Sequence, residues 1–595
     1  MSSFDATPSL DTTPSFDTTA SFARTLVDEW VRSGIVAAVV SPGSRNTPLA
    51  LALVRDTRMR VEVVLDERSA GFRALGIGLA TRRPAIVCCT SGTAAVNLHP
   101  AVVEAHHARV PLLACTADRP AELRDWGAGQ TIDQAALFGG AVRWFHDPGP
   151  PDERVDAAEA NARWRALACR AAACASGPPA GPVHLNLPFR EPLVPTGAPL
   201  LDAPGRAHDE PWVRTSSVRR EPTGADVTRL AALVRAHPRG LLVAGWGADL
   251  DPVVAGRFAR AAGWPVFADP LSQLRTGPHA VSTYEALLRV DEFARAHRPD
   301  LVVRVGAPVT SKITNAWLDD VPTVVVDPDD AWLDPQRAAH ERVRADPDAW
   351  FGALTGALTG AGPEPYPELC PEQSPGPWLA EWLDAERRAR RALDGVLDDD
   401  IACEGRIARD VAAAVPDRGA LVVASSLPVR ALEWCMVPRP GLRVLANRGA
   451  NGIDGFVSTV LGVASSHAGP VVALCGDLCL LHDTNGLLAS GGDAPGARPP
   501  ATFVVVDNGG GGIFAYLPQH DLAEFETLFA TPQSADLVAV ARAHGVAAER
   551  TELADLPKLV AEGAETARVL VVPVDRGAAL EQHARGWHAV ATALG

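Results

Sequence analysis

The sequence predicts an α/β protein of three domains, each built on a parallel sheet that helices cover on both faces. Short apolar runs alternate with helical patterns along most of the chain, which is the order that parallel sheets produce. Two stretches rich in proline and glycine, residues 194–211 and 361–377, divide the chain into parts of similar size. The length of 595 residues agrees with this division, because domains usually hold roughly 100–200 residues.

The first part starts with a degenerate six-residue repeat over residues 1–20, rich in Ser, Thr, Asp and Pro. Such a segment has too few apolar residues to build a core, so we expect a disordered tail. Residues 22–34 have helical periodicity and end at a glycine. Apolar runs that end in turns follow at residues 35–44, 61–66, 85–93, 111–120 and 182–188. We therefore expect the first α/β domain over residues 21–195.

The other two parts repeat this pattern. Between the two linkers, strand-like runs that end in turns lie at residues 240–250, 264–270, 300–310 and 322–329. After the second linker, similar runs lie at residues 419–430, 442–455, 470–478 and 502–508. We expect a central domain over residues 215–360 and a third domain over residues 377–595. Ligands of open parallel sheets bind at the carboxyl ends of the strands, and the polar motifs described below follow these runs.

Composition excludes several classes of protein. A hydrophobic content of 47% and a charged content of 21% are ordinary for a globular enzyme. The net charge of −16 argues against nucleic acid as a partner, because phosphate backbones require a basic face. The ten cysteines form no CxxC pair and no signal peptide is visible, which indicates reduced thiols in the cytoplasm. No apolar run reaches the ~18–20 residues of a membrane span.

Two polar residues follow neighbouring apolar runs in the third part. Asp477 comes shortly after residues 471–474, and Asn508 comes shortly after residues 503–506 and is followed by four glycines. Carboxylate and amide oxygens suit Mg²⁺, and glycines let backbone approach a phosphate closely. The alternative interpretation is two ordinary turns between strands and loops.

These residues resemble the diphosphate- and metal-binding motif of thiamine diphosphate enzymes, usually GDG followed by NN. The resemblance implies that Asp477, Asn508 and the backbone carbonyl of Gly510 bind Mg²⁺ or Mn²⁺. It also implies three domains of the thiamine diphosphate-binding fold type: pyrimidine-binding, central and diphosphate-binding. Leu478 and Asp507 depart from the usual motif, but neither replaces an expected ligand.

The same resemblance assigns further residues around the cofactor. Glu67, which follows an apolar run in the first part, would hydrogen-bond the aminopyrimidine ring and promote loss of the thiazolium proton. Alternatively, Glu67 is an acid placed at a helix N-terminus by the helix dipole. Ile453 would be the bulky residue over which the cofactor bends, or else a core isoleucine. The remaining expected cofactor contacts are Ser426, Gly452, Leu478, Ile513 and Phe514.

Four motifs together resemble one family, the 2-succinyl-5-enolpyruvyl-6-hydroxy-3-cyclohexene-1-carboxylate synthases of menaquinone biosynthesis. They are SPGSRNTPL, ADRPAELRDWGAGQTIDQ, SSLPVR and NRGANGIDG, beginning at Ser41, Ala117, Ser425 and Asn447. The family removes CO₂ from 2-oxoglutarate and joins the remaining succinyl-semialdehyde unit to isochorismate. The resemblance also implies a homodimer or homotetramer with active sites between subunits.

Substrates with several carboxylates require cations, preferably arginine forks. The resemblance assigns isochorismate to Ser44, Arg45, Arg119 and Gln130. It assigns the carboxylate derived from 2-oxoglutarate to Ser426, Arg430 and Arg448. The expected catalytic set is Glu67, Ser426, Arg430, Arg448 and Ile453.

A few positions around these motifs stay open. Lys312, one of only two lysines, matches a substrate-binding basic residue, or is a solvated loop lysine. Gly129 stands where the family commonly has asparagine, which removes one amide contact to isochorismate. His482 and His520 lie near the metal and glycine motifs and could transfer a proton.

Two other functions compete with this interpretation. The chain could be another thiamine diphosphate enzyme, such as an acetohydroxyacid synthase or a 2-oxo acid decarboxylase. Small neutral acyl acceptors would not need the cluster of arginines. A non-enzymatic sensor of anionic metabolites is the third hypothesis, and it predicts loss of Glu67 or of the metal ligands, all of which are present.

Overall fold

The expected α/β class with three parallel sheets is confirmed. The computed structural model describes residues 16–152, 156–201, 203–360, 375–488 and 498–595. The described strands form sheets of six, five and six strands, with the orders β2-β1-β3-β4-β6-β5, β11-β10-β9-β7-β8 and β13-β12-β14-β15-β17-β16. Neighbouring strands run parallel throughout. The first and third sheets share one strand order, and a switch point of parallel sheets is where ligands bind.

The chain divides into two compact units, the first ending at Ser216 and the second beginning at Ser217. The first sheet comprises β1 (Ala37–Val40), β2 (Arg60–Val63), β3 (Ala85–Cys89), β4 (Leu112–Asp118), β5 (Trp144–His146) and β6 (Pro182–Pro188). Its helices are α1 (Thr18–Arg32), α2 (Thr47–Arg55), α3 (Glu67–Thr81), α4 (Thr93–Asn97), α5 (His99–Ala108) and α6 (Ala157–Ser176).

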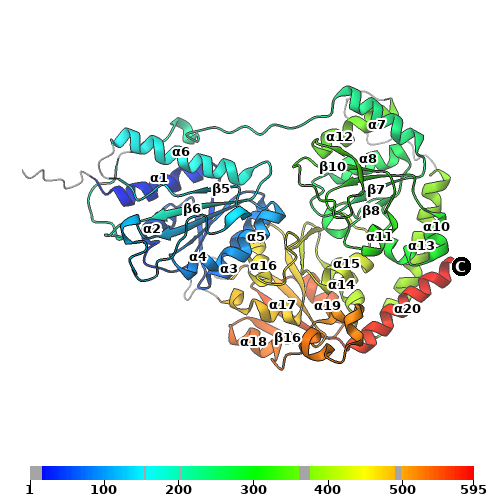
Figure 1. The fold of residues 1–595 in the computed structure, drawn as a ribbon. Coiled ribbons are helices and arrows are strands. Elements are labelled where there is room, and N and C mark those ends of the chain that lie inside the picture. The colour runs from blue at the N-terminus through cyan, green and yellow to red at the C-terminus, as the bar shows by residue number, and fades with distance from the viewer. Residues whose placement is uncertain (1–15, 153–155, 202, 361–374, 489–497) are drawn as a thin grey trace, which may run out of the picture. The chain divides into compact units, whose positions relative to one another are not determined.

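Alternation of side chains along the strands explains why this first sheet is covered on both faces. Ala38 and Val40 of β1 pack in a core with α1, α2 and α6, whereas Ala37 and Val39 pack in a second core with α3, α4 and α5. Figure 1 shows α1 and α6 on one side of the sheet and α3 on the other. A strand with apolar residues at every position is therefore buried on both sides.

The N-terminal helix begins earlier than expected. Asp17 caps α1, because its Oδ1 accepts a hydrogen bond from the Ala20 N–H at 2.9 Å. Residues 18–20 are thus helical, and the expected tail over residues 1–20 does not extend that far. Residues 1–15 lie outside the described part of the chain. The helix is held by Phe22, Leu26 and Trp30, all buried in the first core.

The second unit contains the central and third sheets. The central strands are β7 (Gly240–Ala244), β8 (Val266–Ala268), β9 (Leu301–Val305), β10 (Thr323–Val326) and β11 (Ala339–Val343). The helices around them are α7 (Gly224–Ala236), α8 (Pro252–Ala262), α9 (Tyr284–Leu288), α10 (Asp291–Ala296), α11 (Lys312–Trp317) and α12 (Pro347–Thr359).

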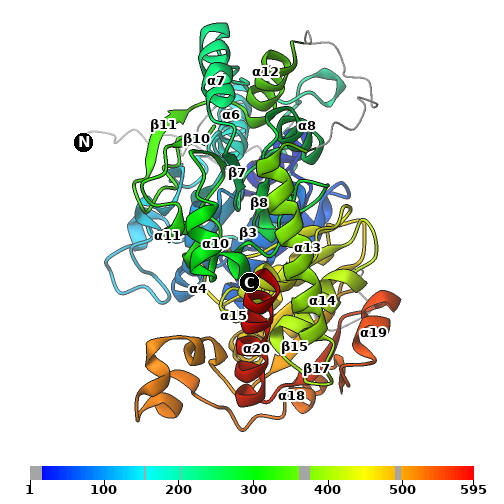
Figure 2. The same ribbon diagram turned by 90° about the vertical axis from the view of Figure 1, so that its right-hand side faces the viewer.

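The third sheet comprises β12 (Ala420–Val423), β13 (Arg443–Leu445), β14 (Val471–Gly476), β15 (Thr502–Asp507), β16 (Ala547–Arg550) and β17 (Arg568–Pro573). Its helices are α13 (Pro377–Leu397), α14 (Glu404–Ala414), α15 (Leu427–Cys435), α16 (Phe456–Ala464), α17 (Asp477–His482), α18 (Leu537–Ala543), α19 (Leu556–Glu562) and α20 (Arg576–Leu594). The helices α13 and α20 lie side by side (Figure 2). Among the described helices, none is both long and apolar enough to cross a bilayer.

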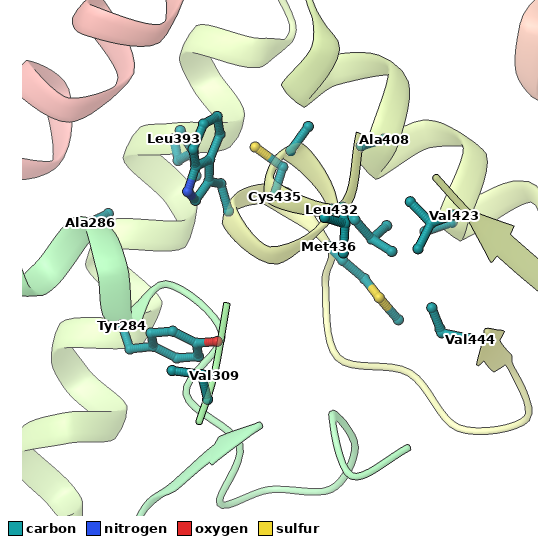
Figure 3. Close-up of a cluster of buried hydrophobic side chains, with 14 of the residues drawn as sticks. Tyr284, Ala286, Val309, Leu393, Ala408, Val423, Leu432, Cys435, Met436 and Val444 are labelled. Carbon is teal, nitrogen blue, oxygen red and sulfur yellow. The ribbon is translucent and has the colours of Figure 1, made fainter. Parts of the chain in front are cut away.

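The central and third sheets share one continuous apolar core. Figure 3 shows Tyr284 and Val309 of the central part in the same apolar cluster as Leu432 and Met436 of the third. Trp382 of α13 also reaches the central sheet, with its ring 5.1 Å from that of Phe267 in β8. The expected boundary at residue 377 therefore falls at the start of a helix that packs on both sheets.

Candidate active site

The carboxyl ends of β14 and β15 bring Asp477 and Asn508 together. The two strands are adjacent and parallel, with Gly476 paired to Val506, so the next residues of both strands emerge at one edge. Asp477 is the first residue of α17, and its Oδ2 accepts a hydrogen bond from the Gly510 N–H at 2.6 Å. The structure thus gathers the three expected metal ligands at one point of the third sheet.

The oxygen atoms in this cluster fit a hard cation. Asn508 donates its Nδ2–H to Oε1 of Glu404 at 2.7 Å. Its Oδ1 is buried and has no hydrogen-bond partner within the described ranges. Buried polar atoms rarely stay unsatisfied, and an amide oxygen beside a carboxylate is a donor set that Mg²⁺ accepts. Burial raises the pKa of Asp477 to about 6, which a cation at this carboxylate would reverse.

Two glycines after Asn508, Gly510 and Gly512, leave no room for a Cβ atom. Gly510 has a φ of +119°, and a Cβ there would lie 1.9 Å from the backbone oxygen of Ala530. A Cβ on Gly512 would lie 2.3 Å from Nδ2 of Asn508. Backbone therefore approaches backbone and the Asn508 amide more closely than any side chain would permit.

We expect Gly510→Ala to unfold or distort this loop, because it adds both a steric overlap and backbone strain. A residue other than glycine at such a φ costs about 1–3 kcal/mol before the overlap is counted. Thermal unfolding measures the loss. Gly263→Ala is the control, since Gly263 has a φ of +69° but open space around the added Cβ. Equal losses in the two variants would show that the close approach to Ala530 does not matter.

The expected apolar wall of the cofactor site lies beside this cluster. Ile453 is half-buried outside the described cores, and its carbonyl accepts a hydrogen bond from Cys479 of α17 at 3.4 Å. The other wall positions are all half-buried: Gly452, Leu478, Ile513 and Phe514.

Ser426 occupies a strained backbone position at the carboxyl end of β12. It is the N-cap of α15, with φ of 79° and ψ of −134°, a region that only glycine adopts easily. Such strain persists where the surrounding structure imposes it, and it concentrates at functional sites. One turn into the helix, the guanidinium of Arg430 donates to the Ser426 carbonyl, so the two residues are held together.

Two arginines of the second unit, Arg430 and Arg448, lie close together. Burial lowers the pKa of Arg430, and the charge of Arg448 lowers it further. Arg448 donates to the hydroxyl of Thr310 at 3.2 Å. Within the described ranges, neither guanidinium forms an ion pair with a carboxylate. Two unpaired cations in one place favour an anionic ligand.

Lys312 follows Thr310 by two residues, so the central part of the second unit brings a lysine near Arg448. The lysine is exposed and is the first residue of α11 rather than part of a loop. His482, the last residue of α17, is exposed, and so is His520, which lies after the glycine-rich loop.

Glu67 opens α3 in the first unit, and Asp66 caps this helix. In the described part of the chain, the Glu67 carboxylate has no hydrogen-bond or ion-pair partner. Burial raises the pKa of the Cys89 thiol, and the charges of Cys88 and Glu67 add to that effect, so Glu67 lies near the end of β3. An unpartnered, half-buried carboxylate is available to a ligand.

Most of the expected isochorismate set converges in the first unit. Arg119 donates to the Ser91 hydroxyl and, at 2.8 Å, to the Gln130 carbonyl. The Gln130 side chain in turn donates to the Ser91 carbonyl at 2.9 Å. Burial lowers the pKa of Arg119, followed by the charge of Arg45, so both guanidinium groups are close. Ser44 is exposed beside Arg45, which pairs with the exposed Glu191 at 3.2 Å.

Comparison with known proteins decides the family. The chain matches the family "Thiamine pyrophosphate enzyme, N-terminal TPP binding domain" over residues 20–137. It matches "Middle domain of thiamine pyrophosphate" over residues 206–423 and "Thiamine pyrophosphate enzyme, C-terminal TPP binding domain" over residues 439–574. A 2-succinyl-5-enolpyruvyl-6-hydroxy-3-cyclohexene-1-carboxylate synthase of Thermobifida fusca is 45% identical over 96% of this chain and 99% of its own.

The chain belongs to this synthase family. A synthase of the same name from Myxococcus xanthus is 41% identical over 96% of this chain and 97% of its own. Another from Chloroflexus aurantiacus is 42% identical over 86% of each chain. The resemblance found in the four motifs is therefore confirmed.

The sequence of this synthase family member did not predict three residues that contact the candidate site. Ser91 joins Arg119 to Gln130, and its place at the end of an apolar run could have suggested it. Thr310 and Glu404 contact site residues that are 138 and 104 positions away. No local pattern signals contacts between segments so distant in sequence.

Proposed function

We infer that the protein removes CO₂ from 2-oxoglutarate with thiamine diphosphate and adds the remaining four-carbon unit to isochorismate. The product is 2-succinyl-5-enolpyruvyl-6-hydroxy-3-cyclohexene-1-carboxylate, a precursor of menaquinone. Membership of the synthase family over nearly the whole chain is the observation that carries this conclusion. The unpaired arginines of the second unit support it, because both substrates carry carboxylates.

We propose that Asp477, Asn508 and the Gly510 carbonyl bind Mg²⁺ or Mn²⁺, and that this ion holds the cofactor's diphosphate. When bound, thiamine diphosphate supplies the carbon nucleophile and the electron sink for decarboxylation. The unsatisfied Asn508 oxygen and the close approach at Gly510 support the assignment. The cofactor's rings would lie against the half-buried residues Ser426, Gly452, Ile453, Leu478, Ile513 and Phe514.

Two groups of cations would bind the two substrates. Arg430 and Arg448, with the Ser426 hydroxyl, would hold the 2-oxoglutarate carboxylate that survives the reaction, and Lys312 would reach an acceptor carboxylate. The isochorismate carboxylates would contact Ser44, Arg45, Arg119 and Gln130. Their neighbours support this division: Thr310 orients Arg448, and Ser91 fixes Arg119. Fixed guanidinium groups position a carboxylate and neutralise its charge without reorganisation.

Glu67 would hold the proton exchanged with the cofactor's aminopyrimidine nitrogen. The site would lie between subunits of a homodimer or homotetramer. Exposed apolar residues next to Glu67 support such an interface, because Val63 is 44% and Leu65 67% exposed. The nine described cysteines are free thiols, which suits a cytoplasmic enzyme.

We expect Arg448→Leu to lower kcat/KM for 2-oxoglutarate by about 10- to 150-fold. Hydrogen bonds to charged groups contribute about 1.5–3 kcal/mol, and each 1.36 kcal/mol is tenfold in rate. Initial rates at varied 2-oxoglutarate measure the loss. Arg585→Leu is the control, since Arg585 makes an exposed ion pair with Asp399. An unchanged constant in Arg448→Leu would remove this arginine from the donor site.

Release of CO₂ from 2-oxoglutarate, with thiamine diphosphate and Mg²⁺ present, tests the function as a whole. We expect fast release that depends on isochorismate. Pyruvate in place of 2-oxoglutarate tests the competing hypothesis of an acetohydroxyacid synthase. Turnover of pyruvate, or a rate of CO₂ release that is the same with and without isochorismate, would overturn the proposed reaction.

A further inference from the structure

We propose that Glu404 is a positioning residue that fixes the orientation of the Asn508 carboxamide, so that its oxygen faces the metal ion. This inference rests on the proposed role of Asn508 as a metal ligand. Glu404 itself would not touch the ion. Its function would be to decide which end of the amide the ion meets.

The hydrogen bond between the two side chains is the first observation. Asn508 has two chemically different ends, an NH₂ that only donates and an oxygen that only accepts. Oε1 of Glu404 accepts the Nδ2–H at 2.7 Å. If the amide were reversed, its oxygen would face the carboxylate oxygen at the same separation, and the two would repel. A carboxylate therefore selects one orientation of the amide.

Burial makes that selection strong. Glu404 is 6% exposed and Asn508 is 8% exposed, so water does not compensate for a wrong orientation. The selected orientation leaves Oδ1 buried and without a partner among the described residues. A cation is a group that would satisfy this oxygen, which no described residue does.

The position of Glu404 is itself fixed by the fold. It is the first residue of α14, where the helix dipole favours a carboxylate. The helix α14 packs against α15 and α19. The buried residues Ile407, Ala408 and Val411 anchor α14 in the core shared by the central and third sheets. A residue on this rigid helix holds Asn508, which sits on a glycine-rich loop.

Metal affinity of two variants of Glu404 tests the proposal first. The probe is Mn²⁺, followed by electron paramagnetic resonance of the free ion, with the full chain and saturating thiamine diphosphate. Glu404→Met removes the acceptor and should weaken Mn²⁺ binding by about 10- to 100-fold, as loss of an outer partner does at other metal sites. Glu404→Gln pairs with either end of the amide and should weaken binding less.

A reversal of sign separates orientation from mere structural support. In an Asn508→Asp background the ligand has two equivalent oxygens, and the Glu404 carboxylate now repels it. There Glu404→Gln should strengthen Mn²⁺ binding, because the new amide donates to the aspartate. The same substitution thus weakens binding with asparagine and strengthens it with aspartate. Effects of equal sign in both backgrounds would overturn the proposal.

Two controls keep the outcomes distinct. Glu433 is another buried glutamate of the same unit, and its carboxylate accepts a hydrogen bond from the Tyr284 hydroxyl. Glu433→Met should leave Mn²⁺ affinity unchanged. Asn508→Ala tests the ligand itself. Unchanged Mn²⁺ affinity in Asn508→Ala would refute the proposed metal site. Weakened affinity in Asn508→Ala with unchanged affinity in Glu404→Met would refute only the role of Glu404. Far-ultraviolet circular dichroism shows which variants are folded.

Discussion

Glu67→Gln is expected to lower kcat by about 100- to 10,000-fold, the range that a positioned acid–base group contributes. Glutamine keeps the size and a hydrogen-bonding oxygen but cannot exchange the proton. In the described structure nothing else pairs with the Glu67 carboxylate, so its removal leaves no buried partner unsatisfied. Thermal unfolding of the variant should therefore match that of the parent, while steady-state turnover collapses.

A matched control separates this role from the helix dipole. Glu159 also lies in the first turn of a helix of the same unit, α6, and pairs with Arg163 on the surface. Glu159→Gln should lose at most the about 0.3–1 kcal/mol of a dipole interaction and keep its turnover. If Glu67→Gln behaves like Glu159→Gln, the carboxylate is only a favourable helix residue and the catalytic role is wrong.

Asp477→Ala is expected to weaken metal binding by more than the about 10- to 100-fold typical of an outer partner. The substitution removes a direct ligand and also the acceptor of the Gly510 N–H. A titration with Mg²⁺ at fixed thiamine diphosphate, followed by turnover and by calorimetry, measures the shift. High Mg²⁺ should restore part of the activity.

A control is needed to show that loss of a carboxylate at a helix terminus does not by itself weaken Mg²⁺ binding. Asp536 caps α18 of the same unit by accepting from the Val538 N–H at 3.0 Å. Asp536→Ala should cost about 0.5–2 kcal/mol of stability, as cap removal does, with an unchanged Mg²⁺ requirement. An unchanged Mg²⁺ titration in Asp477→Ala would contradict the ligand role.

The cluster of Asp477, Asn508 and Gly510 was predictable from sequence because its residues follow directly from strand geometry. Adjacent parallel strands end at one edge, so an acid after residues 471–474 and an amide after residues 503–506 must meet there. The glycines between Asn508 and Ile513 were equally visible, although only the structure explains them by the approach of Ala530. Periodicity likewise predicted the three sheets.

Contacts between distant segments could not be predicted in this way. In the sequence, nothing distinguishes Glu404 from other acidic residues at helix starts. Only the fold shows that it contacts Asn508. The backbone strain at Ser426 could not be predicted from the motif SSLPVR, because serine has no preference for a φ of 79°. The start of α1 at Thr18 depends on the cap by Asp17, which the composition of the repeat obscures.

Isotope tracing tests the proposed carboligation most directly. The protein is given isochorismate, thiamine diphosphate, Mg²⁺ and 2-oxoglutarate that carries different labels at its two carboxylates, and the products are analysed by mass spectrometry. We expect the label of the carboxylate next to the keto group to leave as CO₂. The distal label should appear in a product that also retains the carbons of isochorismate. Distal label found only in free succinic semialdehyde, with isochorismate unchanged, would contradict the proposed reaction.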